Sequence, residues 1–134
     1  MTIVIHHNPE CGTSRNVLEI IRGFAEEPVV VEYLKTGWTR EQLHALFAAA
    51  NLSPREALRV SKSPAEKFGL TDPAVSDKTI LDAMLEQPVL VNRPIVCTKK
   101  DVALCRPSEA VFSLLDVPSG TTFTKENGKV TTAP

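Results

Sequence analysis

The 134-residue sequence has few cysteines and no motif that would pair them. Its three cysteines, Cys11, Cys97 and Cys105, are odd in number, and no two of them have the Cys-x-x-Cys spacing of a dithiol redox motif. A small secreted fold held together by disulfides is therefore a poor interpretation. A reduced compartment, with one functional thiol, fits the sequence better.

The sequence also lacks an excess of charge and any long apolar segment. The formal net charge is -1, so no basic surface is available for the phosphates of nucleic acid, and we expect no such partner. The longest apolar stretches, such as Val29–Val31, are far shorter than the ~18 residues of a membrane span, so we expect no membrane association. The short apolar segment before His6 leaves no hydrophobic region for a signal peptide. We therefore expect a cytoplasmic protein.

Two common ligand-binding motifs are missing as well. None of the six glycines belongs to a G-x-x-x-x-G-K phosphate loop. The histidines and cysteines do not have the short paired spacing of a zinc site, apart from the adjacent His6 and His7. We expect no metal site.

Cys11 stands at a turn between a predicted strand, residues 3–6, and a predicted amphipathic helix. Unpaired backbone N–H groups and the helix dipole favour a thiolate there and lower its pKa from about 8.5 toward about 3.5–7.5. Thr13 or Ser14 can cap this helix, and Arg15 adds positive charge. The alternative is a buried, inert cysteine that happens to precede a helix.

The predicted elements continue with a strand at Val29–Val31, which completes a parallel strand-helix-strand unit. We predict that the middle of the chain is helical, with joints at Gly37, Asn51 and Gly69, because three Ser/Thr residues stand there at capping-box spacing from a Glu or Gln. Ser76 caps a further helix that must end before Pro88. The three capping-box pairs are Thr39 with Gln42, Ser53 with Glu56, and Ser63 with Glu66.

The last third returns to strands, which we predict at Val89–Val91, Ile95–Thr98 and Val102–Leu104. The last two form a hairpin, and a final helix begins at Pro107. The tail from Pro118 either turns a small hairpin at Asn127-Gly128 or is loose.

This order of elements resembles the thioredoxin and glutaredoxin architecture, an α/β fold with a mixed sheet, enlarged by an inserted helical region. We assign residues 1–117 to one such domain, with a helical insertion at about 39–87, and residues 118–134 to a C-terminal tail. In that architecture a cis proline faces the cysteine, and Pro94 is the candidate; an ordinary trans proline at a strand edge is the alternative. Cys97 fits a packing role, and Cys105 is either packing or a second thiol near the site.

Three arginines occupy suggestive positions. Arg59 follows a predicted short helix, Arg93 precedes Pro94, and Arg106 stands before the last helix, whose free N–H groups attract an anion. Each could be a solvated surface residue. Guanidinium groups bind tetrahedral oxyanions through two parallel hydrogen bonds, so a thiolate surrounded by them would attack an oxyanion.

Three motifs in order resemble the bacterial arsenate reductases that depend on glutathione and glutaredoxin. They are His-Asn-Pro-x-Cys-Gly-Thr-Ser-Arg-Asn at residues 7–16, Asn-Arg-Pro-Ile-Val at 92–96 and Cys-Arg-Pro-Ser-Glu at 105–109. The similarity extends to the tail segment 123–126.

The resemblance implies that Cys11 is the nucleophile, that His7 supports its thiolate, and that Arg59, Arg93 and Arg106 bind the substrate. Arg55 lies close enough to compete with Arg59, and His7 could equally serve only to hydrogen-bond the turn.

The implied reaction is the reduction of arsenate to arsenite through a Cys11-arsenate adduct, resolved by glutathione and glutaredoxin. Glutathione is then a co-substrate, and no bound cofactor is expected. One alternative is a transcription regulator of similar fold that binds RNA polymerase, usually through a Cys-x-x-Cys switch that Ser14 removes here. Another is a related thiol reductase with a different substrate.

Overall fold

The computed structural model describes residues 2–134. The chain forms two compact units: the first joins the chain up to Glu32 to Arg93–Pro134, and the second is Tyr33–Asn92. The predicted helical insertion, at about residues 39–87, falls within the second unit. Within the described residues, none of the helices has the length and apolar character that a membrane crossing requires.

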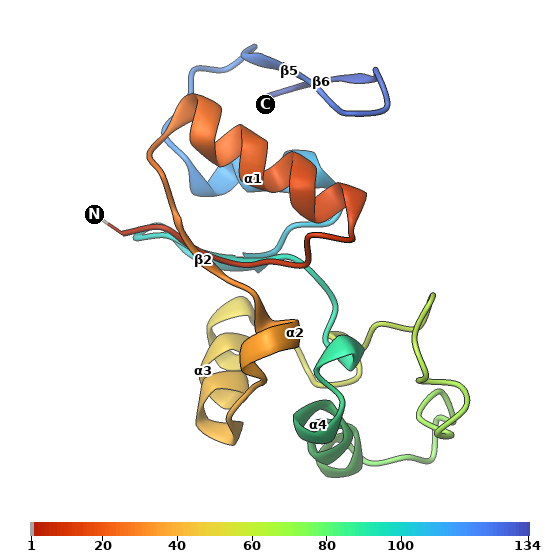
Figure 1. Cartoon of the computed structure of the whole chain (residues 1–134). Helices are drawn as coiled ribbons and strands as arrows, with labels where there is room; N and C mark the ends of the chain where they lie inside the picture. Colours follow the sequence, from red (N-terminus) through yellow and green to blue (C-terminus); the bar gives the residue numbers. More distant parts are fainter. Residues whose placement is uncertain (1) are drawn as a thin grey trace. The chain divides into compact units, whose positions relative to one another are not determined.

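A four-stranded mixed sheet organises the first unit (Figure 1). Its order is β2-β1-β3-β4, where β1 is Val4–His6, β2 is Val29–Val31, β3 is Ile95–Cys97 and β4 is Val102–Leu104. β1 pairs parallel with β2 and antiparallel with β3, and β3 pairs antiparallel with β4. The parallel pair, the late hairpin and the predicted α/β class are confirmed.

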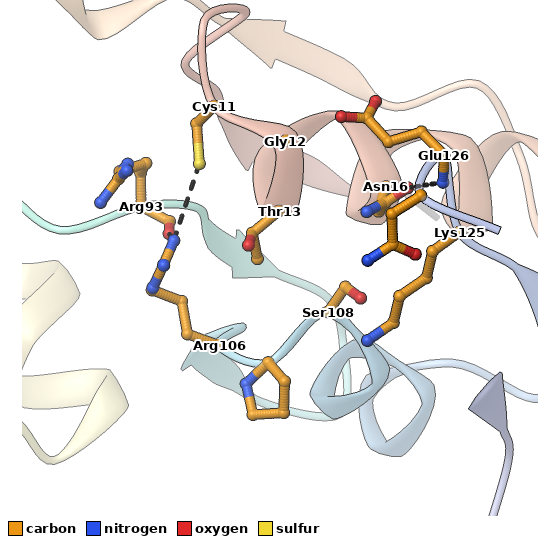
Figure 2. A pocket seen from close by; sticks show the side chains of 11 residues that line it. Cys11, Gly12, Thr13, Asn16, Arg93, Arg106, Ser108, Lys125 and Glu126 are labelled. Carbon is orange, nitrogen blue, oxygen red and sulfur yellow. Dashed lines mark hydrogen bonds between the residues drawn. The ribbon is translucent and has the colours of Figure 1, made fainter. Parts of the chain in front are cut away.

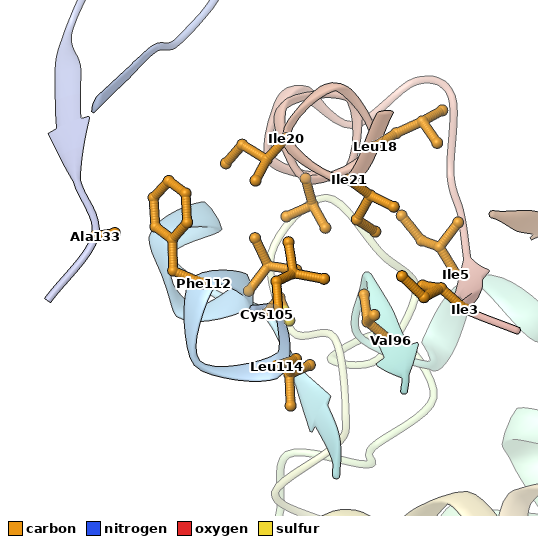
Figure 3. Close-up of a cluster of buried hydrophobic side chains, with 13 residues drawn as sticks. Ile3, Ile5, Leu18, Ile20, Ile21, Val96, Cys105, Phe112, Leu114 and Ala133 are labelled. Atoms are coloured by element: carbon orange, nitrogen blue, oxygen red, sulfur yellow. The ribbon is translucent and has the colours of Figure 1, made fainter. Parts of the chain in front are cut away.

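Helix α1 (Gly12–Phe24) and the 3₁₀ helix η2 (Ser108–Leu114) pack against each other and against the sheet. The apolar residues of α1 recur at the spacing of one helix face, so they point together into a core (Figure 3). The final helix, predicted to begin at Pro107, is a 3₁₀ helix that begins at Ser108, and Pro107 is the residue before it. The buried core cluster comprises Ile3, Ile5, Val17, Leu18, Ile20, Ile21, Val96, Cys105, Val111, Phe112, Leu114, Leu115 and Ala133.

The tail forms an antiparallel hairpin of β5 (Thr122–Thr124) and β6 (Val130–Thr132). Its turn contains Gly128 at φ +88°, a left-handed conformation that suits glycine. The ring of Phe123 lies 6.5 Å from that of Phe24 on α1, and Ala133 belongs to the core cluster. Of the two alternatives for the tail, the hairpin is thus the one observed.

The second unit is helical, with α2 (Tyr33–Thr36), α3 (Arg40–Ala50), α4 (Asp77–Glu86) and the 3₁₀ helix η1 (Pro88–Leu90). The predicted capping box of α3 is confirmed in both directions, because Thr39 accepts from the Gln42 N–H and the Gln42 side chain accepts from the Thr39 N–H. Ser76 caps α4 as predicted. The rings of Tyr33 and Trp38 stack at 4.9 Å.

Three predicted elements of this unit are absent from the described residues: the helices after Ser53 and Ser63, and most of the strand at Val89–Val91. Ser53 and Glu56 form both capping bonds, but one turn follows, because Leu58 leaves to pair with Val91 in an isolated bridge. Ser63 instead bonds the backbone of Arg59 and Ala65, and turns replace the expected helix up to Gly69, whose φ is +73°. The strand expected at Val89–Val91 is mostly η1, with only Val91 in a bridge.

Candidate active site

Cys11 occupies the N-cap position of α1, directly after the loop that leaves β1. The loop is folded by a hydrogen bond from the Cys11 N–H to the Asn8 carbonyl, 3.0 Å, and the Cys11 carbonyl accepts from the Arg15 N–H at 2.9 Å. The expected cap by Thr13 or Ser14 is wrong, because the helix begins at Gly12 and the residue before it is the cysteine itself. The sulfur therefore lies beside the free N–H groups of the first helical turn.

The environment of the Cys11 sulfur stabilises the thiolate. Burial opposes ionisation and is the largest single influence, but several groups together outweigh it. They are a hydrogen bond from the Ser14 backbone N–H, the charge of Arg93, and both the hydrogen bond and the charge of Arg106. Together they hold the pKa of Cys11 below its ordinary value.

Arg106 and Arg93 come from the loops that flank the β3–β4 hairpin. The Nη1 atom of Arg106 lies 3.6 Å from the Sγ atom of Cys11 and also donates to the Arg93 carbonyl at 3.1 Å (Figure 2). The Arg93 side chain is buried, with 7% of the residue exposed. The peptide bonds Arg93–Pro94 and Arg106–Pro107 are both cis, so Pro94 has the isomer of the thioredoxin architecture. The expected anion-attracting helix after Arg106 is not an α-helix but the seven-residue η2.

Cys11, Arg93 and Arg106 share one cavity of about 360 Å³. The cavity combines a polarised sulfur with two guanidinium groups, which can hold a tetrahedral oxyanion in front of a nucleophile. The remaining lining residues are Gly12, Thr13, Asn16, Pro107, Ser108, Lys125, Glu126 and Asn127. Among the described residues there is no group of three His, Cys, Asp or Glu side chains that could hold a metal ion.

His7 does not reach the sulfur directly. Its Nδ1 atom hydrogen-bonds the Ser14 hydroxyl at 2.6 Å, and the same hydroxyl accepts from the Asn8 N–H at 3.1 Å. Burial, the largest influence, lowers the pKa of His7, which favours the neutral ring. Any support that His7 gives to the thiolate therefore passes through Ser14, whose backbone N–H bonds Cys11.

Arg59 belongs to the second unit and is not among the residues that line the Cys11 cavity. Its backbone N–H donates to Leu90 at 2.8 Å and its Nε atom donates to the Ser61 carbonyl at 3.0 Å. The residue is 8% exposed. Its predicted role in substrate binding stays a prediction.

Comparison with known proteins agrees with this geometry. Residues 6–114 match the model of the ArsC family. The chain belongs to the ArsC family. It is 60% identical over 129 residues to arsenate reductase ArsI2 of Synechocystis sp., covering 96% of this chain and 91% of that protein. It is 45% identical over 127 residues to an arsenate reductase of Escherichia coli K12, covering 95% and 90%. The structure of an arsenate reductase from Vibrio cholerae superposes with a TM-score of 0.77, at 35% identity over 86% of this chain and 98% of that one.

In this ArsC-family chain, sequence reasoning missed the contribution of the tail to the site. Lys125, Glu126 and Asn127, at the tip of the β5–β6 hairpin, line the cavity with Cys11. Arg15, expected to add positive charge near the thiolate, interacts electrostatically with Cys11 and is also ion-paired with Glu126 at 2.7 Å. The available signal was the match of residues 123–126 to the family, because nothing local in the tail points to the first helix.

The other two cysteines of the ArsC-family chain are shielded from solvent to different degrees, Cys97 partly and Cys105 fully. Cys105 is fully buried in the core cluster, and burial raises its pKa to about 12. Burial also raises the pKa of Cys97. All three thiols are free. The packing role predicted for Cys97 agrees with its partial burial, and of the two alternatives for Cys105 the structure shows packing in the core. The described residues hold one thiol with a lowered pKa, Cys11.

Proposed function

We propose that this ArsC-family protein reduces arsenate to arsenite, with Cys11 as the nucleophile. The single observation that carries the proposal is the 3.6 Å approach of the Arg106 guanidinium to the Cys11 sulfur inside a cavity that Arg93 also lines. A thiolate and an anionic substrate repel each other, so fixed cations are needed to bring them together. The similarity to proteins named arsenate reductase supports arsenate as the oxyanion.

The first step forms a bond between the Cys11 sulfur and arsenic while one arsenic–oxygen bond breaks. The departing oxygen takes up a proton and leaves as water. Arg93 and Arg106 hold the remaining oxygens and stabilise their charge as the bond forms. Arg59 is proposed as a third ligand, on the resemblance of its position to that of the family's third arginine. The product is a Cys11-arsenate adduct in which arsenic is still pentavalent.

Two thiols then supply the two electrons. The glutathione sulfur attacks arsenic, and a second arsenic–oxygen bond breaks as that oxygen is protonated and leaves as water. A glutaredoxin thiolate then attacks the glutathione sulfur; the bond between that sulfur and arsenic breaks and its electron pair stays on arsenic, so that a mixed disulfide forms as arsenic is reduced from As(V) to As(III). Hydrolysis of the remaining sulfur–arsenic bond releases arsenite and restores Cys11. The lack of a cysteine at position 14 supports an external thiol, because the chain has no partner at Cys-x-x-Cys spacing. We propose glutathione as co-substrate, without a bound cofactor.

We infer a cytoplasmic location from the three free thiols, since a reducing compartment preserves them. The same compartment holds glutathione and glutaredoxin in reduced form. A regulator that binds RNA polymerase would have no use for two arginines around a lone thiolate, so the cavity favours the enzyme.

A steady-state assay tests the proposal. Purified protein with arsenate, glutathione and a catalytic amount of glutaredoxin should oxidise two thiols for each arsenite released, and only when arsenate is present. Cys11→Ser should abolish the reaction, while Cys97→Ser retains it. Full activity of Cys11→Ser, or thiol consumption that does not depend on arsenate, would overturn the proposal. Activity with another oxyanion in place of arsenate would indicate a related thiol reductase.

A further inference from the structure

Arg15 and Glu126 form a two-pronged ion pair between the start of α1 and the tip of the β5–β6 hairpin. The Nε and Nη2 atoms of Arg15 donate to the two carboxylate oxygens of Glu126 at 3.0 and 2.7 Å. The third nitrogen, Nη1, donates to the Pro9 carbonyl at 2.8 Å. We call this arrangement the Arg15–Glu126 clasp. It ties the loop that carries Cys11 to a segment 111 residues away in the chain.

Two further features place the hairpin tip directly against α1. The backbone N–H of Glu126 donates to the Oδ1 atom of Asn16 at 3.0 Å. A Cβ atom on Gly12 would lie 2.9 Å from the Oε1 atom of Glu126, closer than real Cβ contacts come. The glycine after the nucleophile therefore leaves the space that the Glu126 carboxylate occupies (Figure 2).

The tip of the β5–β6 hairpin is also bonded to η2. Lys125 pairs with Glu109 of η2 at 3.0 Å, and the second oxygen of Glu109 accepts from the Thr131 hydroxyl at 3.1 Å. The hairpin tip thus contacts both α1 and η2, and residues of these two helices also line the Cys11 cavity. Because Lys125, Glu126 and Asn127 all line that cavity, the clasp fixes one of its walls.

We propose that Arg15 and Glu126 are positioning residues that hold the hairpin tip as a wall of the Cys11 cavity and so limit the size of the reactants that reach the sulfur. Cys11 is only 6% exposed although it lines the cavity. Arg15 and Glu126 are both exposed, with 44% of each side chain accessible. Exposed ion pairs contribute little to stability. Their effect is therefore expected on access to the sulfur and not on the melting temperature.

The test compares two uncharged thiol reagents of different size, iodoacetamide and N-(1-pyrenyl)maleimide, on the folded protein. The rate constant for the bulky reagent, divided by that for the small one, reports access to the Cys11 sulfur. A change in the thiolate fraction affects both reagents alike and leaves this ratio unchanged. Cys97→Ser serves as the parent protein, so that Cys11 is the one reactive thiol beside the buried Cys105. Mass spectrometry confirms the modified residue. The test does not involve arsenate, so it can fail while the proposed reductase activity stands.

We expect the ratio to rise several-fold in Glu126→Ala and in Arg15→Ala. The double variant should rise no further than the larger of the two single variants, because both break the same clasp. The matched control is Glu27→Ala, which breaks an exposed ion pair near the other end of α1, in which the Arg22 Nε atom donates to both carboxylate oxygens of Glu27. Its ratio should equal that of the parent, and its melting temperature should match those of the clasp variants.

An unchanged ratio in both single variants would overturn the proposal, and so would a double variant in which the two increases multiply. If an alanine variant does not fold, the ratio is measured in Glu126→Gln and Arg15→Lys. These keep most of the side-chain bulk and lose the two-pronged charge pairing. A ratio equal to that of the parent in both would equally overturn the proposal.

Discussion

The Nη1 atom of Arg106 lies 3.6 Å from the Sγ atom of Cys11, although 95 residues separate them in the chain. The same nitrogen donates to the Arg93 carbonyl, so the guanidinium is held in place on the side of the sulfur. A hydrogen bond from a charged donor to a thiolate stabilises the negative charge more strongly than one from a neutral donor. The position of Arg106 is thus part of the reason that the Cys11 pKa is lowered.

Arg106→Lys should lower kcat/KM for arsenate by about 10- to 100-fold, because charge-assisted hydrogen bonds contribute about 1.5–3 kcal/mol. A lysine ammonium cannot reproduce the planar fork that holds the sulfur, the backbone and a substrate oxygen together. The control is Arg40→Lys, which changes an exposed pair with Asp82 in the second unit. Equal kinetics of the two variants and the wild type would show that Arg106 has no role in the reaction.

The rate of Cys11 alkylation by iodoacetamide should rise with pH around a midpoint below about 8.5, the ordinary value for cysteine. The thiolate is the reactive form and its pKa is lowered in the fold, so reactivity is present above the folded pKa and is lost as the pH falls through it. Arg106→Ala removes a charge and a hydrogen bond from the thiolate, and its midpoint should move to higher pH. A midpoint that is the same in both proteins contradicts this assignment.

Ser14→Ala should lower the free energy of unfolding by about 1–3 kcal/mol, as measured by urea denaturation. The Ser14 hydroxyl is fully buried and bonds both the His7 ring and the Asn8 N–H, so its removal leaves two buried polar groups without their partner. Ser113→Ala is the matched control, because the Ser113 hydroxyl bonds a carbonyl at an exposed position. If the free energy of unfolding falls by the same small amount in both variants, the His7–Ser14 hydrogen bond does not stabilise the fold.

Brief alkylation of the folded protein near neutral pH should modify Cys11 and leave Cys105 intact. Cys105 is buried in the core and its pKa is raised to about 12, so almost none of it is thiolate at this pH. Peptide mapping by mass spectrometry reads out the modified positions, and unfolding in guanidinium should make Cys105 reactive as well. Modification of Cys105 in the folded protein at a rate close to that of Cys11 would contradict its assignment as a packing residue.

Local signals predicted the part of the site that Cys11 occupies. The strand, the turn and the helix around it are neighbours in sequence. The caps of α3 and α4 were also predictable, because Thr39 and Ser76 each bond a residue three positions further along the chain. Capping pairs alone misled at Ser53 and Ser63, because a cap stabilises only the first turn and the following residues have other partners. The helix needs both a cap and a continuing apolar face.

Non-local contacts could not be predicted in the same way. Glu126 meets Arg15 across 111 residues, and no periodicity or turn residue in the tail indicates that pairing. The placement of Arg93 and Arg106 beside Cys11 was predicted through the resemblance of their motifs, since each arginine alone fits a surface position equally well. The antiparallel register of β3 with β1, and of β4 with β3, is what brings them there.

The central claim is that the Cys11 sulfur forms a bond with the arsenic of arsenate. X-ray absorption at the arsenic edge, on protein mixed with arsenate in the absence of other thiols, measures this bond directly. The account predicts a sulfur neighbour of arsenic in the wild type and in Cys97→Ser, and oxygen neighbours alone in Cys11→Ser. Oxygen neighbours alone in the wild type, or a sulfur neighbour that persists in Cys11→Ser, would contradict it.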